Sequence, residues 1–353
     1  MMARAASPAT RRAVGLGPLV VGLLLLTAAP AAADPAGPTN YDSTVTAVEP
    51  SDAPVDLAVR GGDAFLVLEV PDGVAVEVPG YDGEPYLRFE ADGTVLVNER
   101  SPARWLNDAR YGELEVDLPA VADADAEPVF VEVAGGGTYA WHDHRIHFMS
   151  PALPPQVDAA GGGVQPVTDW EVPLVVDGQD VVVRGELVWT AGPPTFVVAL
   201  LVALAVVLGA AVAVRWPRMV AGLVALAGVV ALGVALAANL GLPAGMDAQS
   251  VPVVLGGLAL GIAVLGALLS RRGDGRDRLR GDLLAGAAGV PLLVWVVLHL
   301  GALTRPILPG PLPTGAVRAA VVLVAAAGLA GLAALVRTGL AMTSLDASAD
   351  DAG

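Results

Sequence analysis

The sequence predicts an all-β extracytoplasmic domain, with an Ig-like sandwich as the favoured fold, followed by an all-α bundle of about five transmembrane helices. Three observations support this fold class. Residues 34–194 contain short segments in which apolar and polar side chains alternate, residues 195–338 contain long uncharged apolar runs, and residues 1–33 have the layout of an export signal. Alternation with a period of two is typical of half-buried strands, whereas a helix that crosses a bilayer needs about 20 apolar residues.

Ten segments between residues 44 and 189 have the strand pattern: Thr44–Glu49, Val55–Arg60, Ala64–Val70, Val74–Val78, Tyr86–Glu90, Thr94–Asn98, Val129–Val133, Thr138–Trp141, Glu171–Val176 and Asp180–Trp189. Turn residues such as Asp177-Gly178 separate them, as in antiparallel sandwiches; a barrel is the alternative. A helical turn is expected after the sixth segment, with Ser101 as its N-cap and Pro102 at its first position.

Five apolar runs in the second half are long enough to cross a bilayer: residues 196–214, 219–239, 251–269, 283–303 and 315–336. Arginines follow the first, third and fifth runs, whereas the loops at 240–250 and 304–314 carry only Asp247 and Arg305 as charged residues. By the positive-inside rule the Arg-rich side is cytoplasmic. We therefore expect a multipass protein of the cell membrane whose β domain is extracytoplasmic, with a disordered cytoplasmic tail at 339–353.

Small residues recur at a spacing of four in three of these runs: Gly257 and Gly261, Ala285 and Gly289, and Ala327 and Gly331. This spacing lets helix backbones approach closely. We expect it to pack helices within one subunit, and a seam between two copies is the alternative.

The N-terminus is predicted to be a signal peptide covering residues 1–33. Arg4, Arg11 and Arg12 precede the apolar core Val14–Ala29, and three alanines at 31–33 come before Asp34, as at a cleavage site. The apolar core is short for a membrane-spanning helix.

Charge and composition exclude several classes of function. Residues 34–194 hold 29 of the 36 acidic side chains and 7 of the 20 basic ones, a local balance of −22. So acidic a domain would repel nucleic acid, and it favours cationic partners or metal ions. Cysteine is absent, which excludes disulfides, thiolate metal ligands and a thiol nucleophile.

Three of the four histidines lie within six residues, in the segment Trp141–Met149. Imidazole is the commonest protein ligand for zinc and copper, so His142, His144 and His147, with Met149 as a further ligand, are candidate metal ligands. On a strand, His142 and His144 would project from one face about 7 Å apart. His147 has the opposite parity and joins them only if a turn intervenes near Arg145. A structural polar network and acid–base catalysis are the alternatives.

A second candidate site lies at the outer ends of the helices. His299 and Arg318 are ionisable residues in or beside apolar runs, where such residues are functional candidates, and Asn239 could face them. Snorkelling of these side chains toward the interface is the alternative explanation.

Four motifs carry a resemblance to a known family. The chain contains GYDGEPYLRF at 80–89, VNERSPARWLN at 97–107, WHDHRIHFM at 141–149 and DWEVPLVVDG at 169–178. With the helices that follow, these motifs resemble a family of uncharacterised actinobacterial exported multipass membrane proteins, which implies the architecture and no activity. The layout is also similar to that of periplasmic copper-resistance proteins in which a β-sandwich is fused to a membrane bundle. That likeness is architectural only, because the histidines here fall late in the domain.

Two functions are consistent with these features. The first is a membrane-tethered, non-enzymatic binding or accessory module of the cell envelope that presents its loops to an envelope protein. The second is extracytoplasmic handling of copper or zinc through the histidine cluster. A non-enzymatic role is favoured because the sequence contains no nucleophile elbow, HExxH helix, P-loop or dinucleotide fingerprint.

Overall fold

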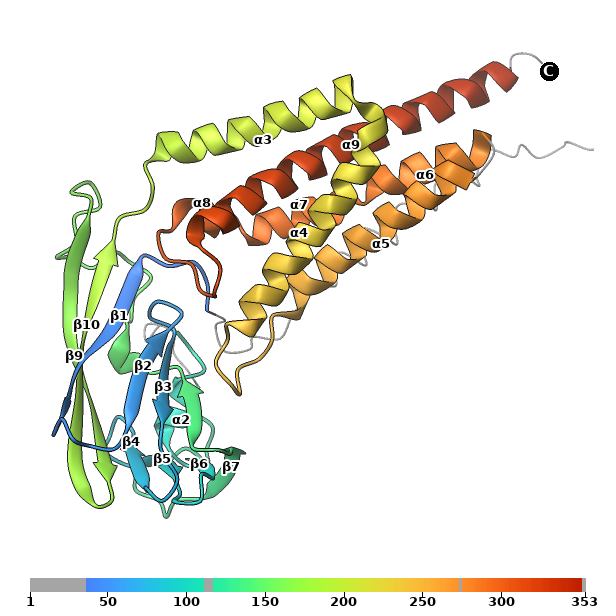
Figure 1. Cartoon of the computed structure of the whole chain (residues 1–353). Helices are drawn as coiled ribbons and strands as arrows, with labels where there is room; N and C mark the ends of the chain where they lie inside the picture. Colours follow the sequence, from blue (N-terminus) through green and yellow to red (C-terminus); the bar gives the residue numbers. More distant parts are fainter. Residues whose placement is uncertain (1–35, 111–116, 273–274, 351–353) are drawn as a thin grey trace, which may run out of the picture. The chain divides into compact units, whose positions relative to one another are not determined.

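The structure is a computed structural model that describes residues 36–110, 117–272 and 275–350. The signal peptide predicted for residues 1–33 lies outside the described residues. The described chain contains a region of antiparallel strands followed by a region of helices (Figure 1), which confirms the predicted fold class.

The β region is a sandwich of two antiparallel sheets (Figure 1). The larger sheet has seven strands in the order β1-β10-β9-β4-β5-β6-β7, and the smaller has three in the order β2-β3-β8. The strands are β1 (Tyr41–Glu49), β2 (Asp56–Arg60), β3 (Phe65–Glu69), β4 (Val76–Pro79), β5 (Pro85–Phe89), β6 (Val95–Asn98), β7 (Phe130–Ala134), β8 (Thr138–Trp141), β9 (Val164–Val176) and β10 (Gln179–Thr190). The helical turn expected after β6 is α2 (Pro102–Leu106), with Ser101 at its N-cap.

Strand β9 begins at Val164, seven residues before the expected start at Glu171. The added residues pair with the end of β10 across a register shift between Leu187 and Val188, opposite Thr168 and Pro166. A proline has no backbone N–H to donate, so strands tolerate it best at such bulges. Pro166 interrupts the alternation of apolar and polar side chains, so the sequence pattern does not indicate this part of the strand.

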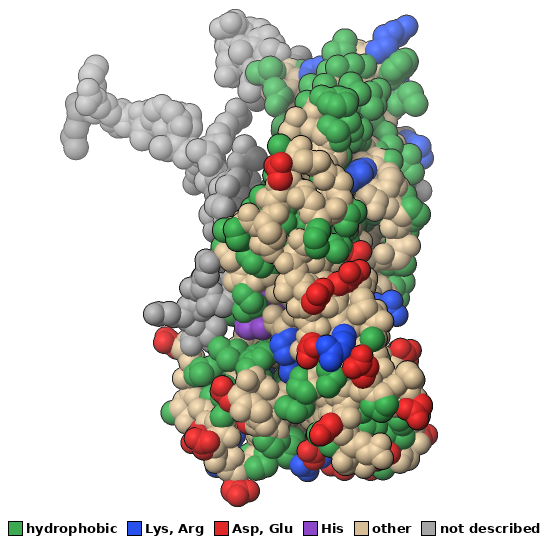
Figure 2. Space-filling model, turned by 90° about the vertical axis from the view of Figure 1, so that its left-hand side faces the viewer, with side chains coloured by type: hydrophobic (Ala, Val, Ile, Leu, Met, Phe, Trp, Pro, Cys, Tyr) green, Lys and Arg blue, Asp and Glu red, His purple; other side chains and the backbone are tan. Residues whose placement is uncertain are grey.

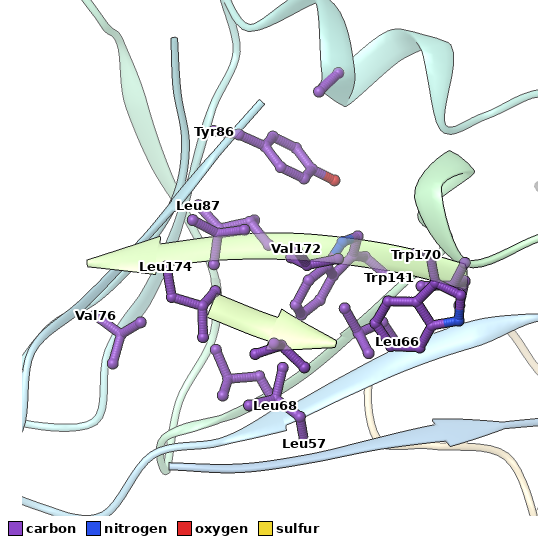
Figure 3. Packing of buried hydrophobic residues seen from close by; sticks show 14 of the residues in the cluster. Leu57, Leu66, Leu68, Val76, Tyr86, Leu87, Trp141, Trp170, Val172 and Leu174 are labelled. Carbon is purple, nitrogen blue, oxygen red and sulfur yellow. The ribbon is translucent and has the colours of Figure 1, made fainter. Parts of the chain in front are cut away.

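The core of the sandwich lies between the two sheets. Leu66 and Leu68 of β3 and Trp141 of β8 face inward from the smaller sheet and pack against the larger one, including Val172 and Leu174 of β9 (Figure 3). All five side chains are almost completely buried. The segment that carries the histidines therefore leaves the sandwich directly from a core strand.

Among the described residues of the helical region, five helices are long and apolar enough to cross a membrane: Thr195–Arg215, Pro217–Leu240, Ser250–Arg271, Asp277–Leu298 and Thr314–Ala341. Its helices are α3 (Thr195–Arg215), η2 (Pro217–Met219), α4 (Val220–Leu240), α5 (Ser250–Arg272), α6 (Gly275–Ala287), α7 (Gly289–Leu298), α8 (Gly301–Thr304) and α9 (Thr314–Asp350). Figure 2 shows hydrophobic side chains gathered over this region and acidic ones over the β region. Helix α9 continues to Asp350, through the tail expected to be disordered, because no proline or glycine interrupts residues 340–350.

Two of the three small-residue pairs lie at helix contacts. A Cβ atom added at Gly289 of α7 would lie 2.7 Å from the carbonyl oxygen of Gly328 in α9, and one at Gly331 would lie 3.1 Å from Cα of Gly289. Backbones this close require glycine. At Gly257 and Gly261 of α5, by contrast, an added Cβ meets nothing within 4 Å among the described residues.

Candidate metal centre

The three clustered histidines follow strand β8 and lie on and around a short 3₁₀ turn. The strand ends at Trp141, and η1 (His144–Ile146) begins three residues later. The Asp143 carboxylate caps the turn by accepting a hydrogen bond from the backbone N–H of Arg145 at 3.0 Å. The turn falls at Arg145, where the sequence required one if His147 was to join the other two histidines.

The turn brings the three imidazole rings together. The ring centroids of His142 and His147 are 4.4 Å apart, and those of His144 lie 5.7 Å from His142 and 5.5 Å from His147. One nitrogen from each ring can be chosen so that all three lie within 4.8 Å of one another. Three nitrogens around one ion at about 2.05 Å would be about 3.5 Å apart, so binding would draw the rings together by roughly 1 Å.

Backbone carbonyls fix which nitrogen of each ring carries a proton. Nδ1 of His142 lies 2.7 Å from the carbonyl oxygen of Ala64, and Nε2 of His144 lies 2.6 Å from that of Ala109. Nδ1 of His147 makes a longer contact, 3.3 Å, with the carbonyl oxygen of Phe148. A carbonyl can only accept, so each of these nitrogens donates and the other nitrogen of each neutral ring keeps its lone pair. The same arrangement orients histidines in metal sites.

Two of the nitrogens that keep lone pairs are buried without a hydrogen-bond partner among the described residues: Nε2 of His142 and Nε2 of His147. His142 is 8% exposed and His147 is 4% exposed. Buried polar atoms are nearly always paired, and each unpaired one costs about 1–3 kcal/mol. Two unpaired acceptors in neighbouring rings therefore call for an explanation, and a bound cation would supply one.

Burial keeps all three rings neutral at physiological pH. The pKa of His142 is lowered to about 4 and that of His147 to about 3, mainly by burial, with smaller lowering contributions from the neighbouring histidines and from Arg110. The pKa of His144 is also lowered by burial, although its contact with the Ala109 carbonyl opposes the shift. Metal ions bind the neutral form of imidazole, so no proton has to be displaced near neutral pH.

A network of polar side chains holds the turn rigid. The Asp143 carboxylate is fully buried and accepts from Arg145 Nη2 at 2.7 Å and from Trp141 Nε1 at 2.8 Å. Burial alone would raise the pKa of Asp143, but these contacts with Arg145 and Trp141 hold it below the usual value. The Tyr81 hydroxyl accepts from the backbone N–H of His144 at 2.9 Å, and its ring stacks on the His144 ring. Asp143 is thus a support for the turn and not a ligand.

A second buried ion pair lies beside the cluster. Asp63 is 1% exposed, and Nη2 of Arg110 lies 2.8 Å from each of its carboxylate oxygens. Burial raises the pKa of Asp63, and the charge and hydrogen bonds of Arg110 oppose that shift. Asp63 and Arg110 are the chain neighbours of Ala64 and Ala109, whose carbonyls orient His142 and His144.

The other candidate residues share no hydrogen-bond partner among the described residues. Met149 is half-buried two residues beyond His147, and its role as a ligand stays a prediction. Asn239 exchanges hydrogen bonds with the backbone of Gln249 at 2.7 and 3.2 Å. Nδ1 of His299 lies 2.8 Å from the carbonyl oxygen of Trp295, and Arg318 donates to the carbonyls of Ala302 and Arg305 at 3.0 and 2.8 Å.

No hydrogen bond or ion pair joins Asn239, His299 and Arg318 within the described part of the chain. Each instead bonds backbone groups, and for Arg318 these belong to α8 and the residue that follows it. Their grouping into one polar site therefore gains no support from these contacts.

Comparison with known protein families, with curated proteins and with solved structures finds no match to this chain. The family resemblance drawn from the four motifs therefore stays a prediction. Any functional conclusion depends on the chemistry of the site.

Proposed function

We propose that this chain is a membrane-anchored protein whose extracytoplasmic β domain binds one copper or zinc ion through His142, His144 and His147. The observation that carries the proposal is the pair of buried Nε2 atoms of His142 and His147 that have no hydrogen-bond partner among the described residues, with the third ring close enough to complete a three-nitrogen set. A purely structural network would use both nitrogens of its buried rings, because each unpaired one destabilises the fold.

The proposed role is binding or delivery of the ion and not catalysis. The ligand nitrogens of His142 and His147 are closed to solvent, so a substrate could not reach a bound ion from their side. Catalytic metal sites keep an open position for water or substrate. A non-enzymatic accessory module of the envelope, with a protein partner that receives or supplies the ion, fits the same features.

The extracytoplasmic placement depends on the sequence. The Arg-rich loops follow the first, third and fifth apolar helices, and the signal-like segment 1–33 precedes the β domain. Both features favour a β domain outside the membrane and a cytoplasmic C-terminus.

Metal content of the purified full chain tests the proposal. The chain in detergent is stripped with a chelator, equilibrated separately with Zn²⁺ and with copper, and freed of excess metal before analysis. We expect about one ion per chain, and its loss in the double variant His142→Ala/His147→Ala, because a single remaining imidazole is too weak a ligand to retain metal.

His299→Gln is the matched control, since it removes the one histidine outside the cluster. It is expected to retain the ion. If the wild-type chain retains no ion, or if the double variant retains as much as His299→Gln, the proposal is wrong. A double variant that is merely less stable, in a chain that never binds metal, would assign the cluster a structural role.

A further inference from the structure

The ligands of the proposed centre carry no negative charge. All three are neutral imidazoles, and both carboxylates tied to the site are already paired, Asp143 with Arg145 and Asp63 with Arg110. The two ion pairs are close, with nitrogen–oxygen distances of 2.7 and 2.8 Å. Each of these two carboxylates is thus largely neutralised by its arginine, and neither is free to bind an incoming ion.

Two of the three ligand nitrogens are also shielded from water, which makes the lack of a negatively charged ligand costly for a bound ion. Nε2 of His142 and Nε2 of His147 are shielded from solvent, so a bound ion would lose its hydration on that side. The cost of moving an ion out of water rises with the square of its charge, so a doubly charged ion pays about four times as much as a singly charged one of equal size.

The number of ligands leads to the same preference. Structural zinc sites use four protein ligands, and catalytic ones add a water to three protein ligands. Asp143 is taken by Arg145 and Trp141, and the Tyr81 hydroxyl is taken by Asn107 and His144. Three nitrogens suffice for a cuprous ion, which accepts trigonal coordination. A thioether is neutral, so a contribution from Met149 would leave the charge balance unchanged.

We infer that the centre selects a singly charged soft cation, cuprous copper, over Zn²⁺ and Cu²⁺. This inference rests on the proposed function and narrows it from a transition-metal site to a site for one charge state. A nitrogen site that follows the usual order of metal affinities binds Cu²⁺ more tightly than Zn²⁺. The proposed centre differs from such a site because the charge of the ion decides its selectivity.

Competition titrations on the purified full chain in detergent test the selectivity. Cu⁺ is kept reduced by excess ascorbate without oxygen and competed against a chromophoric cuprous chelator. Ag⁺ serves as a second singly charged probe that needs no reductant. Zn²⁺ and Cu²⁺ are titrated separately against chelators of known affinity. We expect dissociation constants for Cu⁺ and Ag⁺ at least about 100-fold below those for the two divalent ions.

These titrations distinguish failure of the proposed function from failure of the proposed charge selectivity. If no ion competes with its chelator, the proposed function fails. If Zn²⁺ or Cu²⁺ binds as tightly as Cu⁺ or more tightly, the site exists and the charge selectivity is wrong.

A charge-altering variant gives an independent readout. His144 is the half-buried member of the set, so it tolerates a polar replacement best. His144→Asp adds a negative ligand, while His144→Asn removes the imidazole without adding charge. We expect His144→Asp to shift the Cu⁺-to-Zn²⁺ affinity ratio toward Zn²⁺ by at least about tenfold relative to His144→Asn. Equal ratios in the two variants would overturn the inference, and the wild-type titrations decide it even if neither variant folds.

Discussion

Nη2 of Arg110 lies 2.8 Å from both carboxylate oxygens of Asp63, and this ion pair joins the two loops whose carbonyls orient His142 and His144. Asp63 immediately precedes Ala64, and Arg110 immediately follows Ala109. The pair therefore holds both carbonyls at a fixed separation. Outer contacts of this kind affect metal affinity without touching the metal.

Asp63→Asn is expected to weaken metal binding by about 10- to 100-fold, because it loosens the loops that set the ring orientations. The measurement is the same chelator competition on the full chain. Glu77→Gln is the matched control, since it also replaces a paired carboxylate by an amide but breaks a more exposed ion pair, the one with Arg88. Equal losses of affinity in the two variants would show that the Asp63–Arg110 pair has no specific part in the site.

The metal-free β domain should lose stability as the pH falls below neutrality. The unfolded histidines protonate near their ordinary pKa of 6.5, whereas folded His142 does so at about 4 and folded His147 at about 3. Between those values the unfolded chain binds more protons. The free energy of unfolding therefore falls with decreasing pH, by up to about 1.4 kcal/mol per pH unit for each histidine.

Urea unfolding of the metal-free chain in detergent, followed by tryptophan fluorescence, measures this slope between pH 7 and pH 4.5. The variant His142→Leu/His147→Leu should lack most of it. An unchanged slope in that variant would mean that other groups govern the acid sensitivity.

Gly185→Ala is expected to destabilise the sandwich by about 1–3 kcal/mol, through overpacking. A Cβ atom at Gly185 would collide with the ring of Trp170, which a hydrogen bond of 2.9 Å from Nε1 to Ser43 Oγ holds in place. The urea experiment measures the change. Gly135→Ala is the control, because a Cβ there meets nothing within 4 Å among the described residues. Equal stability of the two variants would contradict the assigned contact.

In the helical region, Gly289→Leu is expected to prevent normal packing of α7 against α9, while Gly261→Leu is tolerated. The first substitution places a side chain against the backbone at Gly328, and the second extends from a position with no described neighbour within 4 Å. Size-exclusion chromatography and thermal unfolding in detergent distinguish them. If Gly261→Leu instead changes the oligomeric state, α5 forms a seam between copies.

The sequence was sufficient to predict the fold class and the histidine set, because both leave local signals. Alternation marks most strands, and three histidines within six residues need no long-range information to be noticed. The requirement for a turn at Arg145 also follows from strand parity alone, and η1 meets it.

The residues that hold the histidine cluster in place could not be predicted from local sequence patterns. Tyr81 lies in a turn that stands out in the sequence, but nothing there indicates that its hydroxyl meets the backbone of His144, 63 residues away. Asp63 and Arg110 are separated by 47 residues, and their pairing depends on how the sheets and α2 come together. The extension of β9 was missed because Pro166 breaks the alternation at a bulge.

The carbonyls that set the ring tautomers have a consequence for when the centre can form. His142 reaches back 78 residues to Ala64, and His144 reaches back 35 residues to Ala109, whereas the ligands themselves are sequence neighbours. In a newly made, unfolded chain the histidines are together but their protons are free to exchange between nitrogens. If the proposed centre exists, it can form only after the tertiary fold, so a chain threaded across a membrane before folding would bind its ion only on the far side.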